Sequence, residues 1–291
     1  MKKIIGIGEI VWDVLPEGKR IGGAPVNFAY FSNELGAIAY PVSAVGKDVL
    51  GDEALKALAP SGLDLSYVQH NAMPTGQVLV DMGAEGIPQY EIIENVAWDS
   101  IECTPEIVGL MKTADVVCWG TLAQRSPKSA ESILKIVDSA PESCLKVYDI
   151  NLRQDFYSKE VVEASLRRAD ILKINEDELP VVCDMFSLHG DEAAQVKELA
   201  GMFSLRNVIY TKGSVCSSVY GMDGSLLSYM PTPKVKVADT VGAGDSFTAS
   251  FVMSMISGKP LPQAHETAVK VAAFVCTMNG AINPLPEDFA L

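Results

Sequence analysis

The sequence predicts a three-layer α/β domain with a mainly parallel central sheet and a small additional β-sheet. From about residue 104 onward, short apolar segments alternate with segments of helical periodicity, which is typical of β–α–β crossover units. The length of 291 residues and a hydrophobic content of 48% are sufficient for a sizeable buried core. We therefore expect a single domain over residues 1–291, with the small sheet covering a cleft.

The amino-terminal elements are predicted as follows. Residues 3–8 (KIIGIG) have the short apolar run of a buried strand, and a mixed loop follows over residues 9–23 (EIVWDVLPEGKRIGG). Residues 24–36 predict a helix that ends at its final glycine. A strand and then a helix around residues 48–59 come next.

The small sheet is predicted from two separate stretches. Residues 76–82 (GQVLVDM) and 88–94 indicate two strands joined by a Gly-containing turn, without an intervening helix. The second strand is predicted from the segment IPQYEII, which begins at the isoleucine before Pro88. Together with the stretch after Ile10, they form a β-element inserted into the α/β pattern. We expect its segments at about residues 10–20 and 75–99.

The remainder of the chain follows a regular alternation. Helices are expected at 104–113, 128–139, 159–168, near 176–186 and at 191–203, and strands at 115–119, 145–150, 170–174 and 207–211. A hairpin then follows over residues 215–220 and 225–230, turning around Met222-Asp223-Gly224. Two helical patterns, at 245–257 and 262–278, close the chain.

Charge and composition exclude several classes of function. There are 23 Lys and Arg residues against 37 Asp and Glu residues, which gives a net charge of -14. A nucleic-acid partner needs a basic face, so none is expected. Small anions are not excluded, because they need only a local positive site.

The cysteines and the hydropathy pattern indicate a cytoplasmic protein. The six cysteines form no C-x-x-C pair, and several, such as Cys118 and Cys276, sit inside apolar runs, which predicts buried reduced thiols. The three histidines are scattered, which argues against a histidine metal site. No stretch reaches the roughly 18 apolar residues of a membrane span, and the apolar run at the amino terminus is too short for a signal peptide.

The sharpest functional motif is Asp239-Thr-Val-Gly-Ala-Gly-Asp-Ser-Phe247, which stands directly before a helical repeat. Gly242 and Gly244 allow the backbone to approach a ligand, and the unpaired N–H groups of a first helical turn suit a phosphate. Asp245 at the same turn is placed to accept a proton from a substrate hydroxyl. The alternative is that Asp245 caps the helix and the glycines only turn the chain.

Two further motifs lie beside predicted helix starts. Gly22-Gly23-Ala-Pro-Val-Asn27 places a glycine pair before a helix, with an amide side chain suited to holding a hydroxyl. Asn175-Glu-Asp-Glu178 follows a strand, and its first and last residues are expected to share a helix face. Carboxylates there suit Mg²⁺ held through water, although a simple acidic helix start is the alternative.

Two more motifs stand at predicted strand ends. Thr211-Lys-Gly213 is either part of a ligand site or a hairpin turn. Asp149-Ile-Asn-Leu-Arg153 brings an arginine that pairs either with a phosphate or with a surface carboxylate. Ligands of open α/β sheets lie at the carboxyl ends of the strands, which is where these motifs fall.

Taken together, these motifs resemble the PfkB (ribokinase-like) family of carbohydrate kinases. GGAPVNFAYFSNELG and DTVGAGDSF match its two signature regions, and NEDE matches its N-x-x-E element. TKG matches the start of a T-x-G-x-x-G element in which Cys216 replaces the last glycine. The resemblance covers nearly the whole chain in order, and it is strongest to bacterial fructokinases through GEIVWDVLPEG, NVAWD (95–99), GTLAQRS (120–126) and YDINLRQDFY (148–157).

This resemblance implies a ribokinase-like fold with a lid and ATP-dependent phosphorylation of a sugar hydroxyl, with D-fructose giving fructose 6-phosphate. Ribose, 2-keto-3-deoxygluconate and a nucleoside are alternative acceptors. A binding or regulatory protein without catalysis is a further alternative, which the intact Asp245 and its glycines argue against. A dinucleotide-binding oxidoreductase lacks support, because Val11 stands where the third glycine of that fingerprint belongs.

The resemblance also assigns roles to individual residues. It implies that Asp245 is the general base and that Gly242, Ala243 and Gly244 form the anion hole for the phosphoryl group. For the sugar, the resemblance assigns Asp13, Gly23 and Asn27 to its hydroxyl groups and Arg153 to phosphate or sugar. For the nucleotide, it places Asn175 and Glu178 near Mg²⁺ and the phosphates, Thr211 and Gly213 along the nucleotide, and Asn279 near adenine or ribose. It assigns Asp239 and the Val241 carbonyl to a monovalent cation, usually K⁺. The expected partners are ATP, Mg²⁺ and a small sugar, and the lid is a candidate interface for a homodimer.

Overall fold

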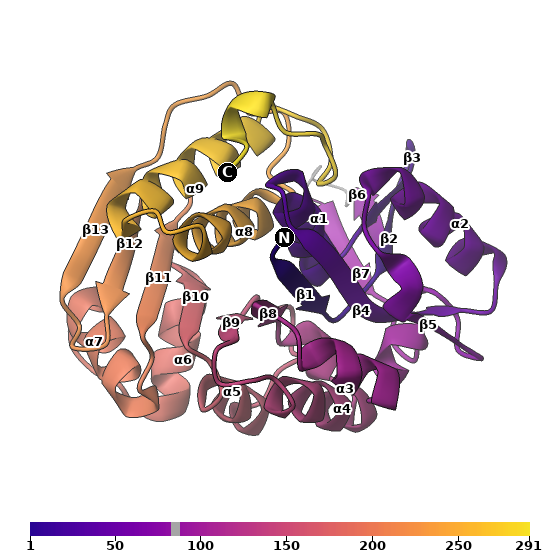
Figure 1. Ribbon diagram of the computed structural model, residues 1–291, viewed down its shortest axis with the longest axis horizontal. Helices are drawn as coiled ribbons and strands as arrows, with labels where there is room; N and C mark the ends of the chain where they lie inside the picture. The colour runs from indigo at the N-terminus through magenta and orange to yellow at the C-terminus, as the bar shows by residue number, and fades with distance from the viewer. Residues whose placement is uncertain (83–87) are drawn as a thin grey trace.

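The computed structural model describes residues 1–82 and 88–291, and its elements follow the predicted alternation (Figure 1). Among these residues, nine strands form one sheet in the order β13-β12-β11-β10-β9-β8-β1-β4-β5. Neighbouring strands from β5 to β11 are parallel, whereas β11, β12 and β13 are antiparallel. The strands are β1 (Lys3–Ile7), β4 (Ile38–Gly46), β5 (Val68–Asn71), β8 (Val116–Trp119), β9 (Leu145–Asp149), β10 (Ile171–Asn175), β11 (Asn207–Lys212), β12 (Cys216–Gly221) and β13 (Leu226–Pro231). The predicted parallel sheet and carboxy-terminal hairpin are confirmed.

Helices cover both faces of this sheet, and each face has its own apolar core. One face carries α1 (Ala24–Glu34), α2 (Val49–Leu58), α8 (Ala243–Ile256) and α9 (Leu261–Val275). The other carries α3 (Pro105–Met111), α4 (Pro127–Asp138), α5 (Lys159–Leu166), α6 (Glu178–Phe186) and α7 (Glu192–Phe203). Figure 1 shows α8 and α9 above the central strands and α3, α4 and α5 below them, which agrees with the predicted three-layer arrangement.

Local sequence explains where these helices begin and which side they bury, as α7 illustrates. The Asp191 carboxylate accepts a hydrogen bond from the backbone N–H of Ala194 at 2.9 Å, which satisfies one of the unpaired donors of the first turn. Val196, Leu199 and Phe203 recur at helical spacing and are buried against the sheet. The helix ends at Ser204, which adopts a left-handed conformation.

A second, smaller sheet lies beside the first, to the right in Figure 1. Its strands, in the order β3-β2-β6-β7, are β2 (Val11–Leu15), β3 (Gly18–Gly22), β6 (Gly76–Met82) and β7 (Pro88–Ile92). The predicted small β-element is therefore confirmed. The Gly-containing turn expected between its last two strands lies outside the described residues.

The prediction of a mixed loop over residues 9–23 is wrong, because β2 and β3 form an antiparallel hairpin there. Its two-residue connection is Pro16-Glu17, which is not one of the Asn-Gly or Gly-X turns that announce a hairpin in a sequence. Parallel pairing of β2 with β6, from a distant part of the chain, extends the sheet. The expectation that the stretch after Ile10 belongs to the small β-element is nevertheless confirmed, and pairing with β6 fixes where its strands lie.

Two tryptophans join the small sheet to the main body. The indole N–H of Trp12 donates to the Leu50 carbonyl at 3.0 Å, and Trp98 is fully buried in the core. The guanidinium of Arg125 lies 3.9 Å from the Trp98 ring centroid and is paired with Asp99 at 2.8 Å. Two of the stretches that carry the resemblance to fructokinases therefore meet at the base of the small sheet.

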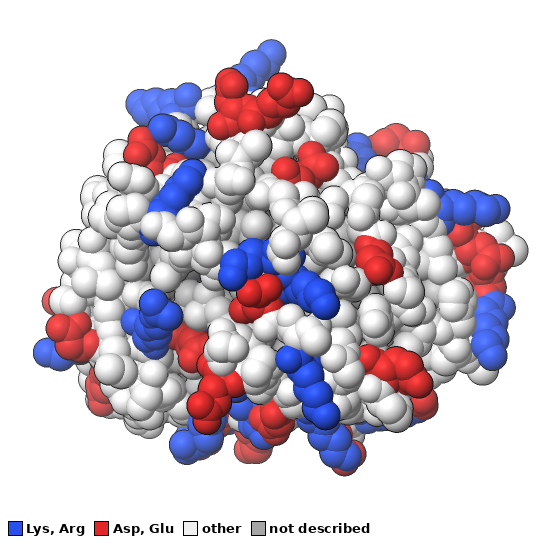
Figure 2. Space-filling model, in the orientation of Figure 1, with Lys and Arg blue, Asp and Glu red and all other residues white. Residues whose placement is uncertain are grey.

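The surface and the thiols have ordinary features. Figure 2 shows acidic and basic side chains interspersed over this face rather than gathered into a field of one sign. All six cysteines are free thiols, and four of them are buried. In the parts of the chain that the structure describes, no helix combines the length and apolar character needed to cross a bilayer.

The fold gathers the predicted motifs at one edge of the main sheet. β1, β8, β9, β10 and β11 are parallel, so their carboxyl ends face the same way. The amino termini of α1 and α8 lie side by side there, since side chains from their first turns touch. This edge is the usual ligand site of an open α/β sheet.

Candidate active site

The first turn of α8 is built from the glycine motif. The helix begins at Ala243, two residues earlier than the predicted 245, so Gly242, Ala243 and Gly244 form its N-cap and first turn. Gly242 has φ of 80°, and a Cβ there would lie 2.8 Å from the Cβ of Ala281, so glycine is required. The first-turn N–H groups have no acceptor within the helix, and they carry its positive dipole end.

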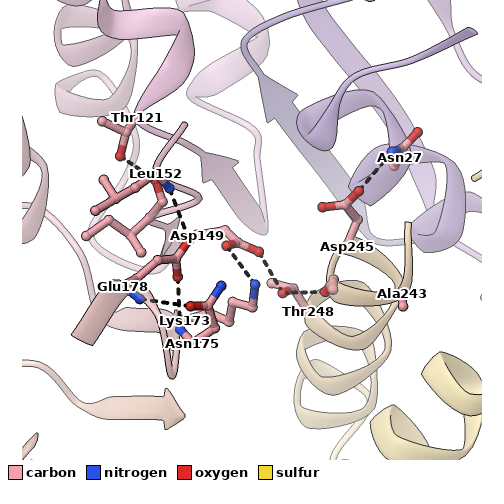
Figure 3. Close-up of polar contacts among 12 residues, drawn as sticks. Asn27, Thr121, Asp149, Leu152, Lys173, Asn175, Glu178, Ala243, Asp245 and Thr248 are labelled. Carbon is pink, nitrogen blue, oxygen red and sulfur yellow. Dashed lines mark hydrogen bonds and ion pairs between the residues drawn. The ribbon is translucent and has the colours of Figure 1, made fainter. Parts of the chain in front are cut away.

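Asp245 lies in this turn and faces α1. One oxygen of its carboxylate accepts a hydrogen bond from the Asn27 side-chain amide at 2.8 Å (Figure 3). Burial, and next the negative charge of Asp149, raise the pKa of Asp245 to about 6, whereas Asn27, Lys173 and Arg153 act in the opposite direction. A carboxylate with this pKa is deprotonated at neutral pH and is a suitable proton acceptor.

Asn27 is buried, and its side-chain oxygen has no hydrogen-bond partner among the described residues. A buried polar atom without a partner costs free energy, so it indicates a position that a ligand or water completes. The orphaned oxygen belongs to the amide that holds Asp245. The pair therefore presents an open acceptor beside a proton-accepting carboxylate.

The start of α1 is tied to the end of β1. Gly23 is the N-cap of α1 with φ of 123°, and a Cβ there would lie 2.2 Å from the carbonyl oxygen of Glu9. The Glu9 carboxylate accepts the backbone N–H of Ala24 at 3.2 Å. Burial raises the pKa of Glu9 to about 7, and the charge of Asp245 acts in the same direction. Sequence reasoning missed Glu9, although an acidic residue directly after a buried strand was a usable signal.

Asp13 on the small sheet lies near Asp239, which precedes α8. Asp13 on β2 pairs in register with Arg20 on β3. Burial, and next the charge of Asp239, raise the pKa of Asp13 to about 6, while Arg20 lowers it. Within the described residues, burial and charge rather than hydrogen bonds act on the Asp13 carboxylate, so its oxygens can accept hydroxyl groups.

Asp239 holds three segments together. Its carboxylate accepts the Arg20 guanidinium at 3.2 Å, the Gly280 N–H at 3.0 Å and the Val241 N–H at 3.1 Å. These donors come from the small sheet, from the loop after α9 and from the turn before α8. Asn279, the neighbour of Gly280, lies in the same loop, and its carbonyl accepts the Asn283 amide at 3.1 Å.

Asn175 and Glu178 do not share a helix face, which corrects the prediction. Asn175 is the last residue of β10, and Glu178 is the first residue of α6. They cap each other, since the Asn175 side-chain oxygen accepts the Glu178 N–H at 2.9 Å and the Glu178 carboxylate accepts the Asn175 N–H at 2.9 Å. The second Glu178 oxygen accepts the Leu152 N–H at 3.0 Å.

The Thr211-Lys-Gly213 turn lies beside this cap. Thr211 on β11 pairs in register with Asn175 on β10. A Cβ at Gly213 would lie 3.2 Å from a carboxylate oxygen of Glu176, so the two turns are in contact. Cys216, which stands where the family pattern has glycine, is the buried first residue of β12, a strand position that accepts a side chain.

Comparison with known proteins identifies the family. The model of the pfkB family carbohydrate kinases matches residues 10–288. The chain belongs to this family. It is therefore a carbohydrate kinase, a phosphotransferase with an alcohol group as acceptor.

The relatives of this kinase have diverse acceptors. Fructokinase-1 of Oryza sativa subsp. japonica is 26% identical over 98% of this chain and 95% of its own length. A ribokinase of Arabidopsis thaliana is 26% identical over 91% of this chain and 69% of its own length. A crystal structure of an E. coli protein described as a ribokinase II, in complex with ATP and Mg²⁺, superposes with a TM-score of 0.82 at 20% identity and covers 99% of each chain. The ribokinase-like fold is thus shown.

Arg153 of the kinase is exposed at the rim of the site. Its guanidinium donates to the carbonyl of the preceding Leu152 at 2.9 Å. Its positive charge lowers the pKa of Glu9, Glu178 and Asp245, each as a minor cause. The Arg153 charge therefore acts on the same region as these carboxylates. Among the described residues, no carboxylate forms an ion pair with it.

Two residues that sequence reasoning did not assign lie beneath the kinase's glycine turn. Lys173 on β10 and Asp149 on β9 are both buried, and they form an ion pair at 3.2 Å. The usable signal was a lysine inside the otherwise apolar strand ILKIN. Asp149 and Asp245 also line one small cavity with Ala24, Pro25, Phe28, Cys118, Trp119 and Gly120.

Other features lie outside this site. A hollow of about 320 Å³ lies at the opposite edge of the sheet, where its lining includes Lys2, Asp115, Cys144 and Asp170. It shares no residue with the glycine turn. Within residues 1–82 and 88–291, no cluster of three or more His, Cys, Asp or Glu side chains is arranged to ligate a metal directly.

Proposed function

We propose that this carbohydrate kinase transfers the γ-phosphoryl group of ATP to D-fructose and forms fructose 6-phosphate. The observation that carries the proposal is the Asp245–Asn27 pair at the first turn of α8. It combines a carboxylate whose pKa is raised to about 6 with an adjacent buried acceptor that lacks a partner. This is the arrangement needed to bind a hydroxyl group and remove its proton.

The proposed reaction is an in-line displacement. Asp245 accepts the proton of the sugar hydroxyl while that oxygen forms a bond to the γ-phosphorus. The bond from the γ-phosphorus to the bridging oxygen breaks, and ADP leaves with the electron pair. The N–H groups of Gly242, Ala243 and Gly244 stabilise the charge that gathers on the phosphoryl oxygens.

The sugar is proposed to lie between the small sheet and α1. Asp13, Gly23 and Asn27 contact its hydroxyl groups, and Arg153 contacts sugar or phosphate. The carboxylate of Asp13 and the open oxygen of Asn27 support this placement. The small sheet is the proposed lid, which excludes water so that water does not accept the phosphoryl group.

ATP is proposed to lie along the carboxyl ends of β10 and β11. Thr211 and Gly213 line its site, Asn279 approaches adenine or ribose, and Asn175 with Glu178 lies near the phosphates. The E. coli neighbour, which binds ATP and Mg²⁺, supports this donor. The contact of the two turns at Gly213 also supports it, since it joins two of the proposed nucleotide-binding elements.

Mg²⁺ fits this arrangement through water. Each Glu178 oxygen accepts one backbone N–H, and a carboxylate oxygen has a second lone pair for a metal-bound water molecule. Mg²⁺ would neutralise charge on the β- and γ-phosphates. Glu178 would orient its hydration shell and keep the turns at Asn175 and Leu152 in place.

K⁺ does not fit the Asp239 carboxylate in the same way. Arg20, Gly280 and Val241 already donate to its two oxygens, and the guanidinium occupies the place of a cation. No step of the proposal therefore involves K⁺.

The choice of fructose rests on weaker support. Residues 95–99 contact residues 120–126 through the buried ion pair of Arg125 and Asp99, so two of the four fructokinase-like stretches adjoin the proposed lid. Fructokinase-1 from rice supports fructose, whereas the Arabidopsis ribokinase supports ribose at the same identity. We further propose a cytoplasmic enzyme, in keeping with six reduced thiols, and a homodimer through the lid.

Coupled measurement of ADP release tests the proposal. The purified kinase is assayed with MgATP and K⁺ on fructose, ribose, glucose, 2-keto-3-deoxygluconate and adenosine. Turnover on fructose alone is expected. Turnover on another acceptor would support the kinase assignment and reject fructose as the substrate. No turnover on any of these acceptors, despite ATP binding, would indicate an untested acceptor or a regulatory protein.

A further inference from the structure

Lys173 is a buried cation that the proposed mechanism does not use. It pairs in register with Asp149 on the neighbouring strand, and its Nζ lies 3.2 Å from Asp149 Oδ1 (Figure 3). The side chains of the pair are only 8% and 9% exposed. The other residues of the strand up to Ile174 are apolar and belong to the core.

The pair makes direct contact with the first turns of α8. Thr248 Oγ1 donates to Asp149 Oδ2 at 3.0 Å. A Cβ at Gly244 would lie 3.2 Å from Lys173 Nζ, so the ammonium group packs against the glycine turn without an intervening side chain. Lys173 therefore stands directly behind the backbone that is proposed to receive the phosphoryl group.

Stability alone does not account for this pair. Removing two charges from water is costly, and apolar residues of similar volume would serve a core at least as well. The nearby carboxylates of Glu178 and Asp245 add negative charge, and a phosphoryl group would add more. Lys173 keeps its proton there, since Asp149, Glu178 and Asp245 raise its pKa against the opposing effect of burial.

We propose that Lys173, held by Asp149, is a positioning residue for phosphoryl transfer, whose ammonium group fixes positive charge behind Gly244 where the phosphoryl group and the base meet. This inference rests on the proposed function, because it assumes that the turn from Gly242 to Gly244 is the anion hole. A fixed charge in a site of low dielectric constant stabilises developing negative charge without reorganisation.

The same charge acts on the base. Polar and titratable side chains from several elements surround Asp245. They are Asp149 on β9, Cys118 on β8, Asn27 on α1, Glu9 after β1, Arg153 after β9 and Lys173 on β10. Lys173 lowers the pKa of Asp245 and Asp149 raises it. Removing the lysine alone therefore raises the pKa of the base, whereas removing both partners does not.

Four variants test the inference. Lys173→Met removes the charge at similar volume, and Lys173→Met with Asp149→Asn removes the pair without leaving an unpaired buried charge. Lys173→Arg restores the charge. Lys146→Met on β9 is the matched control, a lysine on the neighbouring strand away from the glycine turn. Each variant is assayed on the acceptor that the wild type turns over best, from pH 5 to pH 9, after circular dichroism has confirmed folding.

The expected result has two parts. Lys173→Met and the double variant lower the plateau kcat at high pH by about a hundredfold, the size of one lost transition-state contact, with much smaller changes in KM. Lys173→Met also moves the acid limb of the profile to higher pH, the double variant does not, and Lys173→Arg recovers part of both. The control matches the wild type.

The inference is overturned if the folded double variant keeps its plateau kcat within about threefold of the wild type, since a positioning charge would then be dispensable. If Lys173→Met fails to fold, the double variant decides. Failure of the proposed function gives a different result: the wild type itself would then lack activity on every acceptor, or Asp245→Asn would remain active. Ratios to the wild type on one acceptor are independent of which sugar is the natural substrate.

Discussion

Asp239 and Asp245 flank the same glycine turn, six residues apart in the sequence, and have opposite surroundings. Asp239 accepts hydrogen bonds from Arg20, Gly280 and Val241, which come from three different segments. Asp245 accepts one from the neutral amide of Asn27 and lies near the negative charge of Asp149. The Asp239 carboxylate ties three segments together through its donors, and the Asp245 carboxylate is buried beside a like charge.

This difference shows why the residue type alone does not assign a role. Both are aspartates near the glycine turn that is proposed to bind phosphate, and both were singled out from the sequence. Burial and a like charge raise the pKa of the Asp245 carboxylate towards neutrality, which suits it to accept a proton near neutral pH. The proposed base is the aspartate with fewer donors.

The most direct test of this difference is to replace each of the two aspartates, Asp239 and Asp245, with asparagine. Asp245→Asn is expected to lower kcat by about a hundredfold or more, because an amide cannot accept the proton. The fold is expected to remain intact, since the amide oxygen can still accept from Asn27. Initial rates and thermal melts measure the two effects.

Asp239→Asn is the matched control. Asparagine has a single acceptor oxygen, so one of the Gly280 and Val241 N–H groups loses its partner, and the charge that pairs with Arg20 is also lost. Because none of these contacts is placed at the reacting atoms, a fall in kcat of less than about tenfold is expected. Near-normal activity of Asp245→Asn, or an equal loss in both variants, would show that the base is assigned to the wrong residue.

The pH profile sharpens the same contrast. Asp245 must be deprotonated to act, and its pKa is raised to about 6. Below that pH, kcat/KM is therefore expected to fall about tenfold per unit, and above it the profile is expected to level off. The measurement is kcat/KM for the acceptor between pH 4.5 and pH 9.

Glu9 provides a control for this profile, since its pKa is raised to about 7. If Asp245 is responsible, the limb near pH 6 persists in Glu9→Gln and is absent from the residual activity of Asp245→Asn. A limb that disappears with Glu9 would assign the titration to that residue instead.

Asp13 tests the sugar-binding side of the proposed site, because its carboxylate lies close enough to Arg20 and Asp239 for both charges to act on it. Asp13→Ala is expected to raise KM for the sugar by about tenfold and to change KM for ATP by less than about twofold. Steady-state kinetics with each substrate varied in turn separate the two. An equal loss for both substrates would place Asp13 outside the sugar site.

The smallest effect is expected at Arg20, which donates to Asp239 from the small sheet. Arg20→Gln removes a partly exposed ion pair, so kcat is expected to change by less than about threefold. Because the guanidinium occupies the place of a cation, replacing K⁺ with tetramethylammonium is expected to leave the wild type unchanged and to slow the variant. A wild type that already depends on K⁺ would show that Arg20 moves away in solution.

Much of the fold was predictable because it follows local rules. The alternation from residue 104 onward gave strands and helices whose ends agree with the structure to within a few residues, and it indicated a mainly parallel sheet. The hairpin of β2 and β3 was not predictable, since its Pro16-Glu17 turn carries no hairpin signal and its pairing with β6 involves residues far along the chain.

The candidate site likewise contains some residues that the sequence predicted and others that it did not. Gly242, Gly244 and Asp245 were found because a glycine turn before a helical repeat has a local meaning. Lys173 was missed because a single lysine in an apolar strand reveals nothing until its partner on the neighbouring strand is known. The expectation that Asn175 and Glu178 share a helix face failed because the helix starts at Glu178 itself.

The sequence by itself determined the α/β alternation, the turn at the start of α8 and the resemblance to sugar kinases, because each depends on residues close together in the chain. Only the tertiary structure decided which carboxylates are tied and which are free. It set Asn27 against Asp245 and Arg20 against Asp239, pairs separated by 218 and 219 residues. The chemistry of a carboxylate depends on the donors, charges and burial around it, and the fold supplies all three.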